Sequence, residues 1–410
     1  MILKTGFSGL KKHNGQKLLV TPNNSFLTNI QILTSAGSTA EDESIQGMAH
    51  ILEHMFFKGS KKRPGGTAIS RAANDIGGKM NAYTTYDHTV YYITVLNDKF
   101  EEGFDILADM YQNPLFPEEE FAKELNPILS EFREREDDPD GFLMERALQA
   151  YLGENYHPVI GTEKSISSAN VEKMHDFKNR FYGGDNTMIS VSGGVDESVI
   201  LKSVEKYFSS PSPKETPKNI EVNYNPGEII LHKKGIQEAY YTLFYPALPY
   251  SHEDRYRQDM MNYMLGGNDS SLLFERIREE LGMSCYGIYS WSMRHNGFSL
   301  LAISCGIAAD ELDLLHTEVE TQIQRISNEK LEKERLERSR ASLRTSIAAK
   351  SETSAGMNSM ISVPVLRGET EDPVQKSLNA IESISLDDIL DLAQKTFSVQ
   401  PFKAVLLPDK

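Results

Sequence analysis

The chain has 410 residues, of which 39% are hydrophobic, so it is long enough to bury a substantial core, and its length favours two or three domains. Its formal net charge of -16 at pH 7 argues against binding to a phosphate backbone, and solubility is the simplest reason for so acidic a chain. Two cysteines, Cys285 and Cys305, are too few for a disulfide framework, so we expect reduced thiols and a cytoplasmic protein.

Residues 1–20, MILKTGFSGLKKHNGQKLLV, contain no sustained apolar stretch before a cleavage site and do not resemble an Arg- and Ser-rich transit peptide. No segment elsewhere approaches the length needed to span a membrane. The sequence therefore predicts neither an export signal nor a membrane partner.

Residues 43–59 have helical periodicity. Ser44 is placed to cap the start of this helix, and Gly59 is placed to end it in a left-handed conformation. One broad stripe of the helix is apolar, and it consists of Ile45, Met48, Leu52, Met55 and Phe56. We therefore expect that side to pack into the core, while the opposite side carries His50, Glu53 and His54.

The three polar residues of this helix have the spacing of a metal site. His50 and His54 are one turn apart, so both imidazoles can reach one ion, and Glu53 lies beside them. Two neutral imidazoles and a carboxylate would leave one of the four positions around zinc for water, whose pKa the metal lowers to about 7. Glu53 suits the role of a second carboxylate that moves the proton. The alternative is a pair of ordinary surface histidines.

Residues 79–95, KMNAYTTYDHTVYYITV, predict a β-hairpin with His88 near its turn. An exposed sheet edge can accept an extended peptide as an added strand, with affinity from main-chain hydrogen bonds and little dependence on sequence. The tyrosines of this segment can equally serve only the core and edge of the hairpin.

A third metal ligand is expected from residues 117–137, PEEEFAKELNPILSEFRERED. Glu124 and Glu131 are two helical turns apart and share a face. Pro127 lies between them, so we expect it to bend the helix or to start a new one with Asn126 as its cap. The remaining acidic residues of the segment fit a solvated helix.

The order of patterns recurs on either side of a Ser- and Pro-rich run at 209–219, which we interpret as part of a linker over 209–222. Residues 165–191 and 383–407 each predict a helix followed by an apolar strand. The repeat predicts an α+β protein with two related domains, 1–208 and 223–410, each a mostly antiparallel sheet packed with helices. One large mixed domain is the alternative.

The two halves differ at the helix with the histidines. Where the first half has MAHILEHMFFKGS, the second has RQDMMNYMLGGND at 257–269, without histidine. The chain has no phosphate-binding G-x-x-x-x-G-K-[ST] motif, and the charged stretch from Glu329 predicts a solvated helix. We therefore expect the chemistry in the first half and no nucleic-acid partner.

The motif HILEH and the later positions of Glu124 and Glu131 resemble the inverted zinc motif of the pitrilysin/insulinase family. The resemblance covers essentially the whole chain, and it is closest to bacterial proteins similar to the beta subunit of mitochondrial processing peptidase. It implies that His50, His54 and Glu131 bind one Zn²⁺ per chain, that Glu53 is the general base, and that Glu124 is a nearby carboxylate supporting a ligand.

The same resemblance implies residues that bind the substrate. Asn81 and Ala82 match the strand that holds the peptide, and the segment 266–290 matches one in which an arginine and a tyrosine reach the substrate. These are Arg278 and Tyr286, which would hold a carbonyl or carboxylate and stabilise the oxyanion. Tyr286 lies one position later than the family's spacing, where Cys285 falls, but a cysteine cannot replace a phenol in this role. Without the family, Arg278 would be an ordinary surface charge.

The resemblance further implies half of a clam-shell chamber that admits short or unfolded peptides. A homodimer is favoured because one chain holds both the metal motif and the Arg/Tyr segment, and a heterodimer with a related subunit is the alternative. The expected activity is that of a zinc metalloendopeptidase, and manganese or cobalt would suit the same ligands. The rival function is that of a non-catalytic peptide-binding or structural subunit of the same fold, although such subunits typically lack an intact metal motif.

Overall fold

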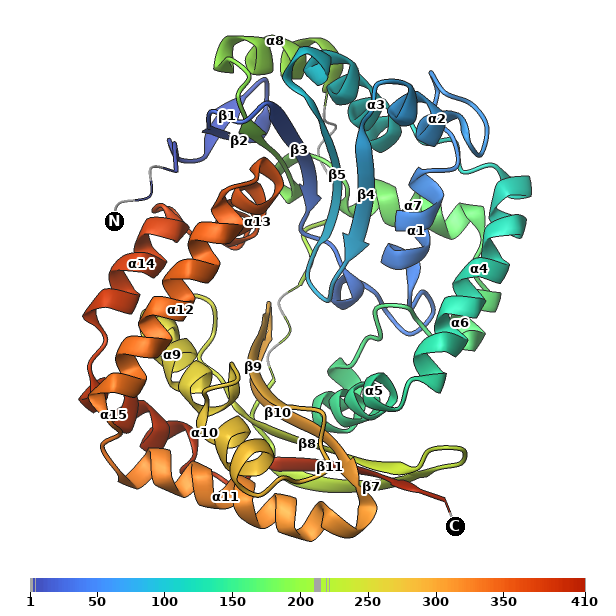
Figure 1. Ribbon diagram of the computed structural model, residues 1–410. Helices are drawn as coiled ribbons and strands as arrows, with labels where there is room; N and C mark the ends of the chain where they lie inside the picture. Colours follow the sequence, from blue (N-terminus) through green and yellow to red (C-terminus); the bar gives the residue numbers. More distant parts are fainter. Residues whose placement is uncertain (1–2, 4, 210–214, 219, 221, 410) are drawn as a thin grey trace. The chain divides into compact units, whose positions relative to one another are not determined.

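The computed structural model describes residues 3, 5–209, 215–218, 220 and 222–409 (Figure 1). The chain forms two compact units. The first consists of Met1–Arg133, His157–Asn219 and Ile347–Lys376, and the second of Glu134–Tyr156, Ile220–Ser346 and Ser377–Lys410. Each unit is thus assembled from three segments of the chain. The expected domains 1–208 and 223–410 are each contiguous, and this division into two domains stays a prediction. Part of the expected linker, at 210–214, 219 and 221, lies outside the described residues.

Among the described residues, six strands form the sheet of the first unit, in the order β1-β2-β6-β3-β5-β4. Their bounds are β1 Lys11–His13, β2 Gln16–Pro22, β3 Leu27–Thr34, β4 Lys79–Thr84, β5 Thr89–Leu96 and β6 Thr187–Gly193. Among these described strands, β2 and β6 pair in parallel and the other neighbours pair antiparallel. The predicted hairpin is confirmed, since β4 pairs with β5, and β4 lies at the edge of the sheet.

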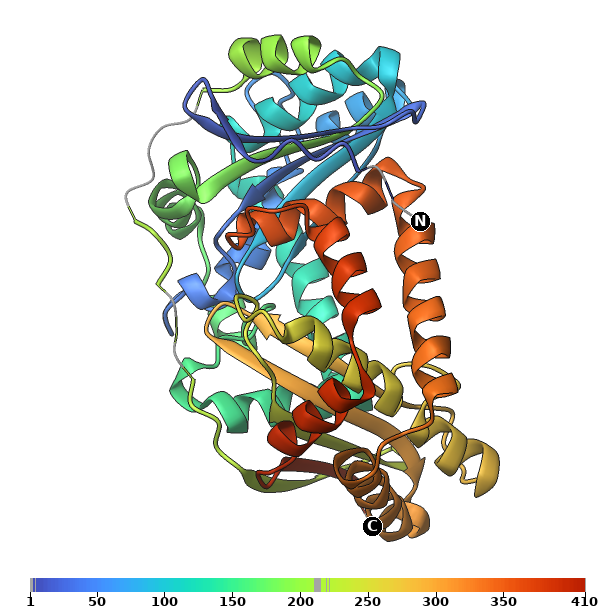
Figure 2. The same ribbon diagram turned by 90° about the vertical axis from the view of Figure 1, so that its left-hand side faces the viewer.

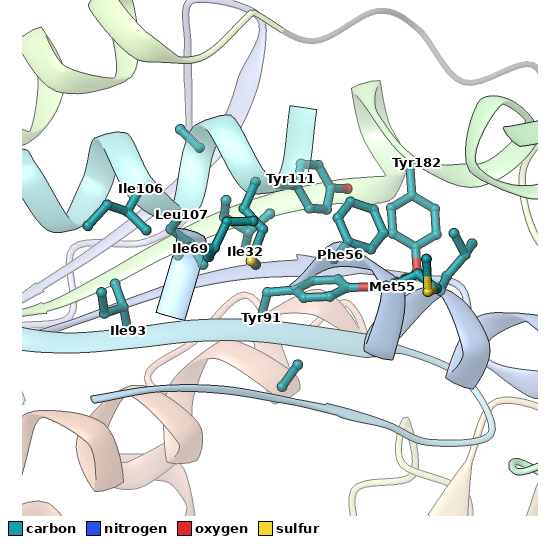
Figure 3. Packing of buried hydrophobic residues seen from close by; sticks show 14 of the residues in the cluster. Ile32, Met55, Phe56, Ile69, Tyr91, Ile93, Ile106, Leu107, Tyr111 and Tyr182 are labelled. Atoms are coloured by element: carbon teal, nitrogen blue, oxygen red, sulfur yellow. Dashed lines mark hydrogen bonds between the residues drawn. The ribbon is translucent and has the colours of Figure 1, made fainter. Parts of the chain in front are cut away.

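Helices accompany this sheet in the first unit, and α1, α2, α3, α8 and α13 contact its strands. The helices are α1 Met48–Phe56, α2 Ala68–Asp75, α3 Phe100–Gln112, α4 Glu118–Asp137, α6 Glu163–Ser167, α7 Val171–Phe181, α8 Glu197–Tyr207 and α13 Ser354–Leu366. The last four residues of α4 belong to the second unit. An aromatic cluster lies under α1, where the ring of Phe56 is 4.8 Å from that of Tyr91 and 5.5 Å from that of Tyr182 (Figure 3). Burying such large rings stabilises the position of α1, because each removes much apolar surface from water.

Helix α13, although late in the sequence, packs on the first sheet (Figure 2). Successive residues of a strand point to opposite faces, so Ile30 faces the apolar core while Asn29 and Gln31 face α13. The amide of Asn358 donates to Asn29 Oδ1 at 2.7 Å, and the hydroxyl of Ser362 donates to Gln31 Oε1 at 2.7 Å. Buried polar groups that are hydrogen-bonded in this way fix the position of the helix on the sheet.

Among the described residues, five strands form the sheet of the second unit, in the order β7-β11-β8-β10-β9. Their bounds are β7 Gly227–Lys233, β8 Glu238–Pro246, β9 Ile288–His295, β10 Phe298–Ala308 and β11 Phe402–Pro408. The helices of this unit are α5 Pro139–Leu152, α9 Arg255–Gly266, α10 Leu272–Phe274, α11 Leu312–Asn328, α12 Lys333–Ser351, α14 Pro373–Ser383 and α15 Leu386–Thr396. The end of α12 and the start of α14 belong to the first unit. A π-helical turn, Glu275–Glu280, continues α10.

The strand orders of the two sheets correspond. In the first, β6 pairs in parallel with β2 and antiparallel with β3, and in the second, β11 pairs in the same way with β7 and β8. The expected α+β fold with two related sheets is therefore confirmed, and each sheet is mixed by one parallel pairing. Within the described residues, no helix is both long and apolar enough to cross a membrane.

Candidate metal centre

Helix α1 starts where a buried carboxylate binds its first amides. The Glu41 oxygens accept hydrogen bonds from the Gly47 and Ala49 amides, each at 2.7 Å. Burial raises the pKa of Glu41 well above its usual value, against the lowering effect of these amides. Ser44 is not the cap as predicted, because its hydroxyl donates to Asp42 at 2.6 Å and α1 begins only at Met48.

The periodicity of α1 is confirmed. All five residues of the predicted apolar stripe are buried, and His50 is buried with them at the border of the polar side. His54 and Glu53 are half-buried. The apolar stripe therefore decides which way the helix faces, and the polar triplet follows from that choice.

Helix α4 is continuous through Pro127, so the predicted new helix start with Asn126 as its cap is wrong, while the bend at Pro127 stays a prediction. Proline lacks the N–H that would bond the carbonyl of Lys123, but the helix continues on both sides of it. Glu124 and Glu131 therefore share one helix face, as their spacing predicts.

The three side chains predicted to bind the metal lie together. Glu131 Oε2 is 3.4 Å from His50 Nε2 and 3.6 Å from His54 Nε2. One ligand atom from each residue lies within 4.8 Å of the others, and within the described residues no other group of three His, Cys, Asp or Glu does so. Ligands about 2.0–2.1 Å from a tetrahedral zinc are about 3.3 Å from one another, so this donor set fits the ion.

Glu124 is hydrogen-bonded to the imidazole of His54. Its Oε1 accepts a hydrogen bond from His54 Nδ1 at 2.9 Å, and its Oε2 pairs with Lys58 Nζ at 2.5 Å. Burial lowers the pKa of His54, but hydrogen bonds to Glu124 and Glu131 and the charge of Glu53 outweigh burial and raise this pKa to about 9. The surroundings of His54 therefore favour a positive charge, and a bound cation would benefit in the same way.

Glu53 is held by a residue that the sequence did not single out. Thr84, the last residue of β4, donates its hydroxyl to Glu53 Oε2 at 2.7 Å. Ala82 and Thr84 are two positions apart and therefore share a strand face, and α1 packs on β4. The alternation of residues in β4 is a signal that could have identified Thr84.

Asn81 and Ala82 lie on the edge strand. The Asn81 side chain is exposed, and its Oδ1 accepts a hydrogen bond from the Ala82 amide at 2.9 Å. That amide is therefore turned away from the β5 partner strand. The open edge and the exposed amide side chain are what a peptide strand would need, and the substrate role of these two residues stays a prediction.

Arg278 and Tyr286 belong to the second unit and lie together there. The guanidinium carbon of Arg278 is 5.5 Å from the ring centre of Tyr286 and equally far from that of Phe274. The phenol of Tyr286 is 87% exposed, whereas Cys285 is buried. Of the two neighbouring residues, Tyr286 is thus the one with an accessible side chain, and its role toward a substrate stays a prediction.

Comparison with known proteins agrees with the inverted motif. Residues 20–157 match the model described as Insulinase (Peptidase family M16), and residues 168–343 match that of the Peptidase M16 inactive domain. A protein of Rickettsia felis named uncharacterized zinc protease is 31% identical over 99% of both chains. One of Bacillus subtilis, also named uncharacterized zinc protease, is 29% identical over 92% of both.

Solved structures show the same fold. A structure described as a protease from Helicobacter pylori has a TM-score of 0.91 at 20% identity and covers 98% of this chain and 99% of its own. A putative M16-like peptidase from Alicyclobacillus acidocaldarius has a TM-score of 0.83 at 20% identity, with both chains covered completely. With a relative of more than 30% identity along its whole length, the chain belongs to the pitrilysin/insulinase family, peptidase family M16.

Proposed function

We propose that this chain is a zinc-dependent endopeptidase that cleaves short or unfolded peptides. The observation that carries the proposal is the convergence of His50 Nε2, His54 Nε2 and Glu131 Oε2 at the spacing of zinc ligands, with Glu53 beside them. The names of the zinc proteases that it resembles support the same metal. One Zn²⁺ per chain is proposed, because the described residues contain one such donor set.

Zinc held by these three residues would supply Lewis-acid polarisation of the scissile carbonyl and of a water molecule. Glu53 acts as the general base, taking a proton from the attacking water and giving it to the leaving amine nitrogen. Thr84 holds one oxygen of this carboxylate, so the other oxygen is the one that carries the proton. Glu124 keeps the His54 ring in place through its Nδ1.

The substrate would bind along β4. An extended peptide that pairs with this edge would take the Ala82 amide as a donor and displace the Asn81 carboxamide from it. Recognition through main-chain bonds gives affinity with little sequence preference. Arg278 and Tyr286 are proposed to hold the substrate and stabilise the oxyanion, on the strength of the family resemblance and of their shared position in the second unit.

The proposal extends to assembly and location. A clam-shell chamber closed by two copies would exclude folded proteins, and a homodimer is proposed over a heterodimer because one chain carries both sets of residues. Light scattering should then give about twice the chain mass of 46.1 kDa, and a monomer at working concentration would argue against the dimer. A cytoplasmic location is proposed from the two unpaired cysteines.

The test combines metal analysis with cleavage of quenched fluorescent peptides. We expect about one zinc per chain, activity that a chelator removes and zinc restores, and loss of activity in Glu53→Gln with zinc still bound. Glu119→Gln is the matched control, because Glu119 lies on α4 but is 84% exposed and its ion pair is with Lys123 on the helix surface. Activity that survives both chelation and Glu53→Gln would refute the proposal. Zinc binding with no cleavage of any peptide would favour the rival non-catalytic subunit.

A further inference from the structure

A buried ion pair lies at the turn between β4 and β5. The guanidinium of Arg367 binds both oxygens of Asp87, with Nε 2.9 Å from Oδ2 and Nη2 2.9 Å from Oδ1. The side chains are 11% and 2% exposed. Asp87 Oδ1 also lies 2.7 Å from His88 Nδ1. Bidentate pairing of this kind fixes direction as well as distance.

The guanidinium comes from a rigid support. Arg367 directly follows α13, whose residues Asn358 and Ser362 are hydrogen-bonded to the buried polar face of β3. A segment from near the end of the chain is thus fixed to the sheet at one end and to the β4–β5 turn at the other.

The turn connects this ion pair to Glu53. Thr85 Oγ1 donates to Asp87 Oδ1 at 3.2 Å, and the Thr85 amide donates to the His88 carbonyl at 2.8 Å. The preceding residue, Thr84, donates its hydroxyl to Glu53. The turn packs so closely on Gly37 that a Cβ there would lie 2.2 Å from the Thr85 carbonyl oxygen. The end of β4 therefore has little freedom to shift.

We infer that Thr84 is a positioning residue for Glu53, and that the Asp87–Arg367 pair acts through Thr84 by holding the end of β4. The inference rests on the proposed function and names residues of the same site. A glutamate side chain has several rotamers, and a base works only when its free oxygen faces the attacking water. The hydroxyl of Thr84 removes this freedom by binding the other oxygen, and the ion pair keeps the hydroxyl at the required distance.

The alternative is that the Thr84–Glu53 hydrogen bond and the Asp87–Arg367 pair only stabilise the fold. The test compares the chain with Glu53→Gln, Thr84→Val, Thr84→Ser, Arg367→Met and the double variant Thr84→Val/Arg367→Met. For each, kcat and KM on a quenched peptide, bound zinc and the melting temperature are measured. Arg63→Met is the control, because Arg63 also makes ion pairs in the first unit, with Asp105 at 2.7 Å and Asp109 at 3.3 Å, and both carboxylates lie on α3 rather than on β4 or its turn.

We expect Thr84→Val to lower kcat by about tenfold or more, with KM changed by less than about threefold and zinc retained. Thr84→Ser keeps the hydroxyl and should recover most of the loss. Arg367→Met should lower kcat by about three- to tenfold, and the double variant should be no slower than Thr84→Val alone, since the pair acts through Thr84. Arg63→Met should lower the melting temperature without this loss of kcat.

The inference is overturned if Thr84→Val has the kcat of the unmodified chain, if the two losses multiply in the double variant, or if Arg63→Met loses as much kcat as Arg367→Met. In each case the proposed function would still hold if the unmodified chain is active and Glu53→Gln abolishes that activity. An unmodified chain without peptidase activity, or an active Glu53→Gln variant, would overturn the proposed function and this inference with it.

Discussion

Removal of the Glu124 carboxylate should weaken the binding of zinc although Glu124 is not a ligand. Its two oxygens bind His54 Nδ1 at 2.9 Å and Lys58 Nζ at 2.5 Å. In Glu124→Ala the His54 ring loses the partner that keeps Nε2 directed at Glu131, and it loses a negative neighbour that favours a cation. Burial raises the pKa of Glu124, but the bonds to His54 and Lys58 outweigh it and keep the carboxyl ionised.

The size of the effect follows from the two contributions of this side chain. Losing an outer partner of a metal-binding histidine costs about 10–100-fold in affinity, or about 1.4–2.7 kcal/mol, for Glu124→Ala. Glu124→Gln keeps an oxygen that accepts from Nδ1 but loses the charge, so we expect about three- to tenfold. Lys58 is 25% exposed and can turn to water, so the free energy of unfolding should fall by only about 1 kcal/mol.

The measurement is the zinc dissociation constant, obtained by competition with a chromophoric chelator, together with urea unfolding of each metal-free variant. Glu119→Ala serves as the control on the same helix, since its side chain is 84% exposed. The expected order of affinity is control, Gln, then Ala. A Glu124→Ala variant that binds zinc within twofold of the unmodified chain would show that the carboxylate does not orient His54.

Three further changes test separate parts of the structure. Gly47→Ala should lower the free energy of unfolding, measured in urea, by at least about 2 kcal/mol. The reason is that φ at Gly47 is +83° and a Cβ there would lie 2.6 Å from the Ile160 carbonyl oxygen. An unchanged free energy of unfolding would refute the left-handed start of α1. Pro127→Ala should raise the free energy of unfolding by about 1–2 kcal/mol and leave the zinc affinity unchanged, since it restores one helix hydrogen bond. A lower free energy of unfolding would contradict a continuous α4. The neighbouring Cys305 thiol lowers the pKa of Cys285, so Cys305→Ala should move the midpoint of Cys285 alkylation to higher pH, as followed by mass spectrometry. An unchanged midpoint would show that Cys305 does not act on Cys285.

The sequence was sufficient for those parts of the site that depend on local period. The 3.6-residue repeat placed His50, Glu53 and His54 on the side of α1 away from its apolar stripe, and that stripe is buried. The two-turn spacing placed Glu131 on the same face of α4 as Glu124. Each result needs only the geometry of one helix, and the family resemblance supplied the pairing between the two helices.

The residues that hold the site in place could not be predicted from local periodicity. Ser44 had the local pattern of a cap, but Glu41, brought in by the fold, binds the first amides of α1 instead. Arg367 reaches the β4–β5 turn from a position 280 residues away in the sequence. Contacts of this range depend on packing rather than on propensity, and the same is true of α13, whose attachment to the first sheet makes the compact units discontinuous.

The second unit provides an internal control for the meaning of the polar triplet. Helix α9 takes the place of α1 beside a sheet of corresponding strand order, and it buries Met260, Met261 and Met264 together with polar residues such as Gln258 and Asn262. Where α1 has His50 and His54, α9 has Asp259, which pairs with Arg294 at 2.6 Å, and Tyr263.

The fold is therefore built without histidines at these positions. In α1, His50 is buried next to the carboxylate of Glu131, an arrangement that costs desolvation without improving the packing of the stripe. Histidines are present in α1 and absent from the corresponding helix α9. A metal site accounts for this difference, whereas the stability of the fold does not.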